Sequence, residues 1–388
     1  MKYPLAADTW DHREIAAIQS VIEGGRYTMG PRVKQFENEF ATAFGVKHAV
    51  MVNSGSSANL LMIASLVLDS RYDLNSGDEV IVPAVSWSTT YFPLSQYGLK
   101  AVFVDIDKDT LNIDPSKIVK AITPKTKAIL AVNLLGNSCD YYALNDLASE
   151  FNLILLEDNC ESLGAKYKGK MLGTIGTMGT FSFFFSHHMQ TMEGGMIVTD
   201  DDQTAQYLRS LRAHGWIRDL PDENHLWNKT GDPFEDSFKF VLPGYCVRPL
   251  EMSGAVGSVQ LSKMPDMIAK RRANAKVFGE HFPDILDVNT QMEIGESSWF
   301  GFSIVCKGKL LGRRKELLTA LSQAGVETRP IVAGNFTKNP VIKYISHEIR
   351  GSLDNADYID QNGFFIGNDS RDLSEEIIEV AKIVKGLL

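Results

Sequence analysis

The stretch HAVMVNSGSSANLLMIASLVL, residues 48–68, indicates the fold of this 388-residue chain. It begins as a β-rich apolar run, turns at Ser and Gly residues, and continues as an apolar helical pattern. The stretch 78–98, DEVIVPAVSWSTTYFPLSQYG, repeats this scheme. Further apolar strands are expected in 100–107, 126–136 and 152–160. Apolar strands that alternate with helices predict an α/β fold, with a mostly parallel mixed sheet covered on both faces.

Composition excludes several classes of protein. Apolar residues make up 44% of the chain and charged residues 22%, which is typical of a soluble globular protein. The net charge of -9 gives no electrostatic support for binding nucleic acid. The first residues lack an apolar signal core, and no apolar run is long enough to cross a membrane. We therefore expect a cytoplasmic protein without a membrane partner.

The four cysteines are far apart in the sequence. They are Cys139, Cys160, Cys246 and Cys306, separated by 20, 85 and 59 residues. This spacing fits neither a zinc site nor a disulfide framework, and it shows no grouping for an iron–sulfur cluster. We expect free thiols in a reducing compartment, and no metal.

The chain is long enough for more than one domain. We expect a large α/β domain over residues 1–250 and a smaller C-terminal α+β domain over 251–388. A long helix is predicted over 248–282, between the two, and a long polar loop over 217–237.

Polar residues recur where the predicted strands end, which is where ligands of such sheets bind. Gly55, Ser56 and Ser57 stand between a strand and a helix, where free N–H groups and hydroxyls form a phosphate cradle, or where serine simply caps the helix. Asp158 ends a buried strand and needs a cation: either a basic side chain, or the protonated nitrogen of a pyridine ring. Trp87 is either a core residue or a stacking partner of a flat ring.

A histidine pair stands between a Phe-rich strand and Glu-Gly-Gly in GTFSFFFSHHMQTMEGGMIVTDD, residues 179–201. Histidine titrates near neutral pH and is the usual general acid or base. His187 and His188 are therefore candidates for catalysis, with structural roles as the alternative.

Taken together, these motifs resemble the PLP-dependent sugar aminotransferase family with the aspartate aminotransferase fold (fold type I). The resemblance also rests on FVDID (103–107), RAHGW (212–216) and PGYCVRP (243–249), and covers nearly the whole chain. It implies pyridoxal or pyridoxamine 5′-phosphate as cofactor, with the phosphate at Gly55, Ser56, Ser57 and Ser182. Trp87 would stack on the ring, Asp158 would pair with the ring nitrogen, and Glu161 would lie near the ring hydroxyl.

The chain departs from the family at the residue that normally binds the cofactor covalently. Counting back six residues from Glu193, the family's lysine falls on His187, and no lysine stands between Lys170 and Lys229. Ordinary transamination is therefore in doubt. A small subset of the family, the sugar 3-dehydratases, carries histidine here, and the resemblance implies that His187 is the acid–base catalyst.

The resemblance also implies the partners. They are a GDP-linked 4-keto-6-deoxy sugar, L-glutamate as amino donor, and a second copy of the chain in a homodimer with shared active sites. The pathway expected is that of the 3,6-dideoxysugar colitose, in O-antigen and other polysaccharides. His214, Arg329 and Phe336 are expected near the substrate.

Three points stay open. One histidine-bearing relative uses an iron–sulfur cluster, which the cysteine spacing disfavours here. Cys246 replaces an asparagine that in the family reaches a phosphate of the neighbouring subunit. The alternatives to a dehydratase are a nucleotide-sugar aminotransferase and a non-catalytic binding protein with the same fold.

Overall fold

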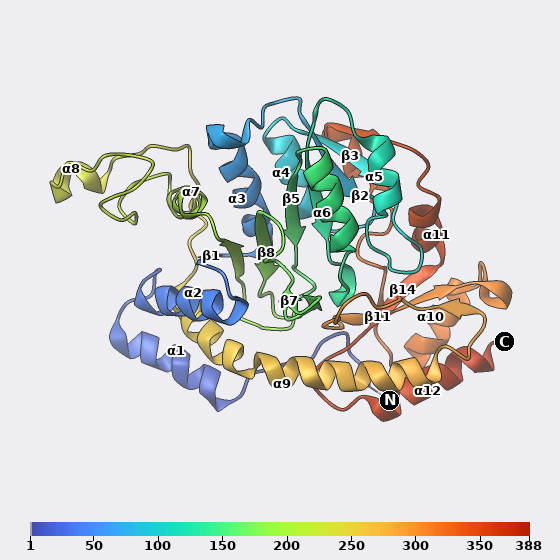
Figure 1. Ribbon diagram of the computed structural model, residues 1–388. Helices are drawn as coiled ribbons and strands as arrows, with labels where there is room; N and C mark the ends of the chain where they lie inside the picture. The colour runs from blue at the N-terminus through green and yellow to red at the C-terminus, as the bar shows by residue number, and fades with distance from the viewer. Residues whose placement is uncertain (1) are drawn as a thin grey trace.

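The computed structural model describes residues 2–388 and contains an eight-stranded sheet, a four-stranded sheet and a two-stranded sheet of β6 and β7, with helices packed around them (Figure 1). The strands are β1 His48–Val52, β2 Glu79–Pro83, β3 Lys100–Val104, β4 Thr126–Val132, β5 Ile154–Asp158, β6 Lys166–Tyr167, β7 Lys170–Met171, β8 Met178–Ser182, β9 Gly195–Thr199, β10 Val288–Asn289, β11 Gly301–Cys306, β12 Thr328–Arg329, β13 His347–Ile349 and β14 Gly363–Gly367. The helices are α1 His12–Gly24, α2 Pro31–Phe44, α3 Gly55–Leu68, α4 Ser88–Gln96, α5 Pro115–Ala121, α6 Tyr141–Glu150, α7 Asp202–Arg212, α8 Pro233–Ser237, α9 Glu251–His281, α10 Arg314–Gln323, α11 Asp354–Asn362 and α12 Ser374–Gly386.

The larger sheet has the strand order β1-β9-β8-β5-β4-β2-β3-β13. The pairs from β8 to β13 are parallel, and β9 is antiparallel to both of its neighbours. The mostly parallel mixed sheet predicted from the sequence is therefore confirmed. Because β1, β2, β4, β5 and β8 run in one direction, their carboxyl ends lie along one edge of the sheet.

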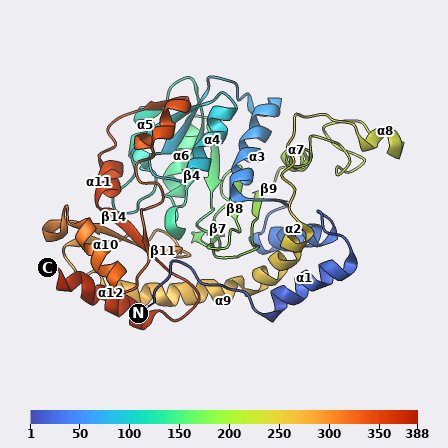
Figure 2. The same cartoon turned by 180° about the vertical axis from the view of Figure 1, so that it is seen from behind.

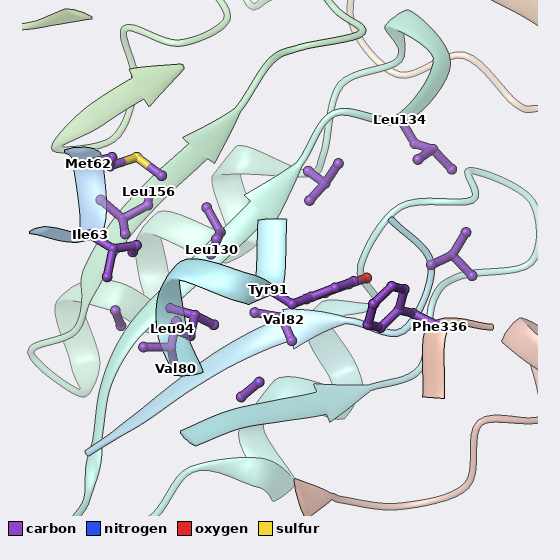
Figure 3. Packing of buried hydrophobic residues seen from close by; sticks show 14 of the residues in the cluster. Met62, Ile63, Val80, Val82, Tyr91, Leu94, Leu130, Leu134, Leu156 and Phe336 are labelled. Carbon is purple, nitrogen blue, oxygen red and sulfur yellow. The ribbon is translucent and has the colours of Figure 1, made fainter. Parts of the chain in front are cut away.

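The apolar strands are buried on both faces because their side chains alternate between two helical layers. Val80, Val82 and Leu130 pack with α3, α4 and α7, while Ile81 and Ile129 pack with α5 and α6. Figure 3 shows the first of these layers, in which side chains of β2 and β4 meet those of α3 and α4. This two-sided burial explains the continuous apolar runs in the sequence.

The second sheet, β10-β11-β14-β12, is antiparallel and packs with α10 and α12. Figure 2 shows this α+β unit grouped with both chain ends at one end of α9. Two segments cross the expected boundary: β13 joins the large sheet beside β3, and Tyr3 packs in the core of the small unit. The division at residue 250 stays a prediction.

The long helix expected over 248–282 is observed as α9, and it runs beneath both units in Figure 1. The prediction of a polar loop over 217–237 is wrong in one detail, because Pro233–Ser237 forms the short helix α8. Asp232 caps α8 by accepting a hydrogen bond from the Phe234 N–H. The segment after α7, which ends in α8, projects from the body in both views (Figures 1 and 2).

Candidate active site

The turn between β1 and α3 forms a cradle at the edge of the sheet. Ser54 caps α3 by accepting a hydrogen bond from the Ser57 N–H, so the capping function weighed for this turn is present. The Ser56 side chain remains exposed, with its hydroxyl 3.2 Å from that of Thr89. The cradle thus combines the N-terminus of a buried helix with accessible hydroxyl groups, which suits an anion.

Gly55 is required by the close approach of β8. A Cβ at this position would lie 2.6 Å from the Ser182 Cβ and 3.0 Å from the Cys160 Sγ. The structure therefore brings Ser182, which is distant in the sequence, to the turn that contains Gly55, Ser56 and Ser57.

Asp158 lies at the end of β5 with 4% of its surface exposed. One carboxylate oxygen accepts hydrogen bonds from the Asn59 amide and the Thr90 hydroxyl, both at 2.8 Å, and the other accepts from the Cys160 N–H at 3.1 Å. Within residues 2–388, no lysine, arginine or histidine forms an ion pair with this carboxylate. The alternative of a structural salt bridge finds no basic partner among these residues. A buried carboxylate of this kind calls for a cation supplied by a ligand.

Glu161 lies one turn beyond Asp158. Its carboxyl accepts a 3.0 Å hydrogen bond from the Leu135 N–H. Burial, with a smaller contribution from the charge of Asp158, raises the pKa of Glu161 to about 7. A carboxyl with this pKa can accept or donate a hydrogen bond near neutral pH.

The two histidines follow β8 in a segment without regular structure. The His187 ring packs edge-on against Phe184 and Phe300, with centroids 5.9 and 5.2 Å away. Its Nδ1 is buried and has no hydrogen-bond partner in residues 2–388. Burial lowers the pKa of His187 to about 4, and the charge of Arg271 acts in the same direction. His187 is therefore a neutral imidazole at pH 7, as a general base must be.

His188 has a different environment. It is only 1% exposed, and its Nε2 lies 3.1 Å from the Ser298 carbonyl oxygen. The chain therefore gives the two neighbouring histidines different surroundings, one partly accessible and one enclosed.

Trp87 and His214 flank the same edge. Trp87 precedes α4 and is 59% exposed, so it is not a core residue. His214 has a left-handed backbone (φ 63°), its N–H donates to the Tyr245 carbonyl, and its ring packs against Trp216. Two residues after Tyr245, the Val247 carbonyl accepts a hydrogen bond from the Asn53 N–H. Asn53 directly precedes the cradle, so this bond links the chain around His214 to the cradle.

The other two residues expected near the substrate are placed differently. Arg329 is exposed on β12 of the second sheet. Phe336 is 2% exposed, and its ring packs against Tyr91 in the core (Figure 3). Its backbone N–H donates to the Ala84 carbonyl, next to the end of β2. Phe336 is therefore a core residue, and the expected substrate contact finds no support in this placement.

Sequence reasoning missed three polar residues around the site. Asn59 and Thr90 bind Asp158, and Arg271 of α9 is 2% exposed near the histidines. The only local signal was Asn59, an amide within the otherwise apolar run of α3.

The four cysteines of the described residues are free thiols, not joined in disulfides. Cys139 and Cys306 are buried, Cys160 is partly buried, and Cys246 is exposed, with its Sγ 3.5 Å from the Arg248 Nη2. In the part of the chain that the structure describes, no three His, Cys, Asp or Glu side chains are grouped as metal ligands. None of the helices described is both long and apolar enough to span a bilayer.

Residues 8–385 match the model of the DegT/DnrJ/EryC1/StrS aminotransferase family. The chain belongs to this family. It is 55% identical to GDP-4-keto-6-deoxy-D-mannose 3-dehydratase of Yersinia pseudotuberculosis, over 99% of this chain and 98% of that protein.

Solved structures of a dehydratase of that name superimpose closely. One holds a trapped PLP–glutamate geminal diamine (54% identity, TM-score 0.97, 99% of this chain and 100% of that one). A histidine-to-asparagine variant holds GDP-perosamine (54%, 0.97, the same coverage). In a further variant, a histidine and the serine directly before it are replaced by lysine and asparagine (53%, 0.96, 97% and 100%).

Proposed function

We propose that this chain is a PLP- and PMP-dependent lyase that removes the C3 hydroxyl from GDP-4-keto-6-deoxy-D-mannose. L-Glutamate serves as the amino donor, and ammonia is released. The observation that carries the proposal is that the site contains both a buried carboxylate, Asp158, with no basic partner in residues 2–388, and a neutral histidine, His187, where the family has lysine. The product belongs to 3,6-dideoxysugar synthesis for lipopolysaccharide O-antigen.

The residues of the site fit the cofactor. The cradle at Gly55, Ser56 and Ser57 offers N–H groups and hydroxyls for a phosphate, and Asp158 offers a buried negative charge for a ring nitrogen. Trp87 presents an exposed flat ring. The bound cofactor supplies an amine for the C4 ketone and an electron-withdrawing ring.

His187 is the residue that we assign to proton transfer. As a neutral imidazole it can take up the proton lost from carbon, and the same nitrogen can then deliver that proton to the departing C3 hydroxyl oxygen. A lysine at this position is protonated at neutral pH and would bond covalently to the cofactor. Histidine avoids both, so the C3–O bond breaks in preference to transfer of an amino group.

The substitutions in a variant of the related dehydratase support the choice of His187 over His188. The histidine replaced there directly follows a serine. In the segment after β8, the serine–histidine pair of this chain is Ser186–His187, whereas His188 follows a histidine.

We also propose that two copies form a homodimer in which each completes the other's site. Phe234 on the projecting segment is 87% exposed, Phe238 and Phe240 directly after it are 67% and 54% exposed, and Leu250 before α9 is 57% exposed. Apolar side chains gathered on one projection are typical of an interface between subunits. Sedimentation of the wild type and of Phe234→Ser/Phe238→Ser tests this: the wild type should sediment as a dimer and the variant should dissociate.

Product analysis tests the reaction. The enzyme is incubated with cofactor, L-glutamate and GDP-, CDP- or dTDP-linked 4-keto-6-deoxy sugars, and ammonia and sugar mass are measured. Ammonia with a 3-deoxy product from the GDP sugar is expected. A stable amino sugar would identify an aminotransferase, and tight binding without turnover would identify a binding protein. We place the enzyme in the cytoplasm, where its free thiols stay reduced.

A further inference from the structure

The segment 183–194 carries His187 between β8 and β9, and its far end is held firmly. Phe183 and Met189 are fully buried in the aromatic cluster around α2. The Gln190 N–H donates to the Gln260 side chain of α9, and the Gln190 carbonyl accepts from the Trp10 indole. These contacts fix the two ends of the segment, and between them the His187 ring packs against the rings of Phe184 and Phe300, with no hydrogen-bond partner for its Nδ1 in residues 2–388.

His188 supplies a polar contact from this segment to the C-terminal part of the chain. A carbonyl oxygen can only accept a hydrogen bond, so the His188 Nε2, 3.1 Å from the Ser298 oxygen, must carry a hydrogen. Burial and the nearby charge of Arg271 hold the pKa of His188 well below its usual range. His188 is therefore a neutral donor in a single tautomer, and it is poorly suited to exchange protons during a reaction.

The acceptor segment is itself rigid. The Ser298 N–H donates to the Gly136 carbonyl and the Phe300 N–H to the Leu135 carbonyl, both at 3.0 Å. The buried Arg271 guanidinium donates to the carbonyls of Trp299 and Phe300. Trp299 and Leu135 both have left-handed backbones, with φ 49° and 52°. Two such strained residues persist only where the surroundings fix them.

This segment also lies beside the reacting groups. The Phe300 ring contacts both imidazoles, with centroids 5.2 Å from His187 and 5.6 Å from His188. The Leu135 N–H, on the other side of the junction, donates to Glu161. The paired segments 134–136 and 298–300 therefore contact both His187 and Glu161, and they set the positions of these two residues relative to each other.

We infer that His188 is a positioning residue for the dehydration: its Nε2–H bond to the Ser298 carbonyl aligns the imidazole of His187 with the site. This inference rests on the proposed function, since the reaction that it serves is the one proposed above. A displacement of about 1 Å in a catalytic group costs about 10²-fold in rate.

The test compares two substitutions of His188. His188→Phe keeps the ring and removes the donor, whereas His188→Gln places an amide N–H near the position of Nε2. His347→Phe is the matched control, because the His347 ring also bonds to a backbone carbonyl, that of Ile345 at 2.8 Å, but on β13 at the sheet edge. We expect His188→Phe to lower kcat about 10- to 100-fold with KM for the sugar within threefold. His188→Gln should recover most of kcat, and the control should match the wild type.

Equal losses in both His188 variants, or near-normal kcat in His188→Phe, would overturn the inference. A second measurement covers failure of a variant to fold. NMR of ¹⁵N-histidine in the wild type should show a neutral His188 ring with a slowly exchanging Nε2–H at pH 7. A protonated ring, or a rapidly exchanging Nε2–H, would refute the hydrogen bond from His188 to the Ser298 carbonyl. Because this measurement needs no turnover, absence of dehydration by the wild type would count against the proposed function alone.

Discussion

The Asn59 amide donates a 2.8 Å hydrogen bond to the Asp158 carboxylate in the buried base of the site. Thr90 donates to the same oxygen and the Cys160 N–H to the other, so three neutral groups solvate a carboxylate that no basic side chain of residues 2–388 pairs with. Such a carboxylate is costly to the folded protein until a cationic ligand binds. Asp158 should therefore contribute to ligand binding and not to the stability of the ligand-free protein, and substitution can separate these two effects.

Asp158→Asn should weaken catalysis far more than folding. An amide cannot stabilise a positive charge on the ring nitrogen, so we expect kcat to fall about 10²-fold or more and cofactor affinity to drop. The thermal midpoint of the cofactor-free protein should hold or rise.

Asp105→Asn is the matched control for that substitution. Asp105 is also a buried carboxylate, beyond the end of β3, but it accepts the N–H groups of Asn355 and Ala356 at the start of α11. This variant should lose stability without a specific loss of cofactor affinity. If Asp158→Asn lost stability and rate in equal measure, its role would be structural.

His187→Asn should keep the fold and still bind the cofactor, because the amide and the imidazole have comparable bulk. It should lower the dehydration rate about 10²- to 10⁴-fold, as expected for loss of an acid–base group. The half-reaction with glutamate, followed by cofactor absorbance, should slow as well. His12→Asn, which alters a side chain 90% exposed on α1, should leave both rates unchanged. Near-normal dehydration by His187→Asn would place the base elsewhere.

The wild type should form no covalent bond between cofactor and lysine. Borohydride reduction followed by peptide mapping should therefore recover no pyridoxyl-lysine. His187→Lys should introduce that bond, seen as a shift in cofactor absorbance and as one modified peptide covering residue 187. This variant should not dehydrate the sugar at the wild-type rate. Stoichiometric labelling of a lysine in the wild type would contradict the assignment.

Most helices and strands of this fold could be predicted from local sequence patterns, because strand, turn and helix signals depend on neighbours in sequence. The helix α9 and the placement of Asp158 at a strand end were predicted in this way, and a serine cap was one of the two roles considered for the turn before α3. The partners of Asp158 were not, since Asn59 and Thr90 reach it only after three separate segments pack. Likewise β13 joins the large sheet by pairing over more than 240 residues of sequence, which no local pattern encodes.

The surroundings of His187 predict that acid weakens the fold. Its pKa is about 4 in the folded protein and 6.5 as its ordinary value, so between these limits the unfolded chain binds a proton that the folded chain does not. Stability contributed by this group is therefore complete above pH 6.5 and is lost as the pH falls toward 4. At pH 5 the loss is at most about 2 kcal/mol.

Glu161 acts in the opposite sense, because its raised pKa makes the folded state take up a proton at a higher pH than the unfolded chain. The difference between the wild type and His187→Asn isolates the histidine: thermal midpoints measured from pH 7.5 to 5 should fall less steeply in the variant. Parallel curves would show that His187 titrates normally in the folded protein.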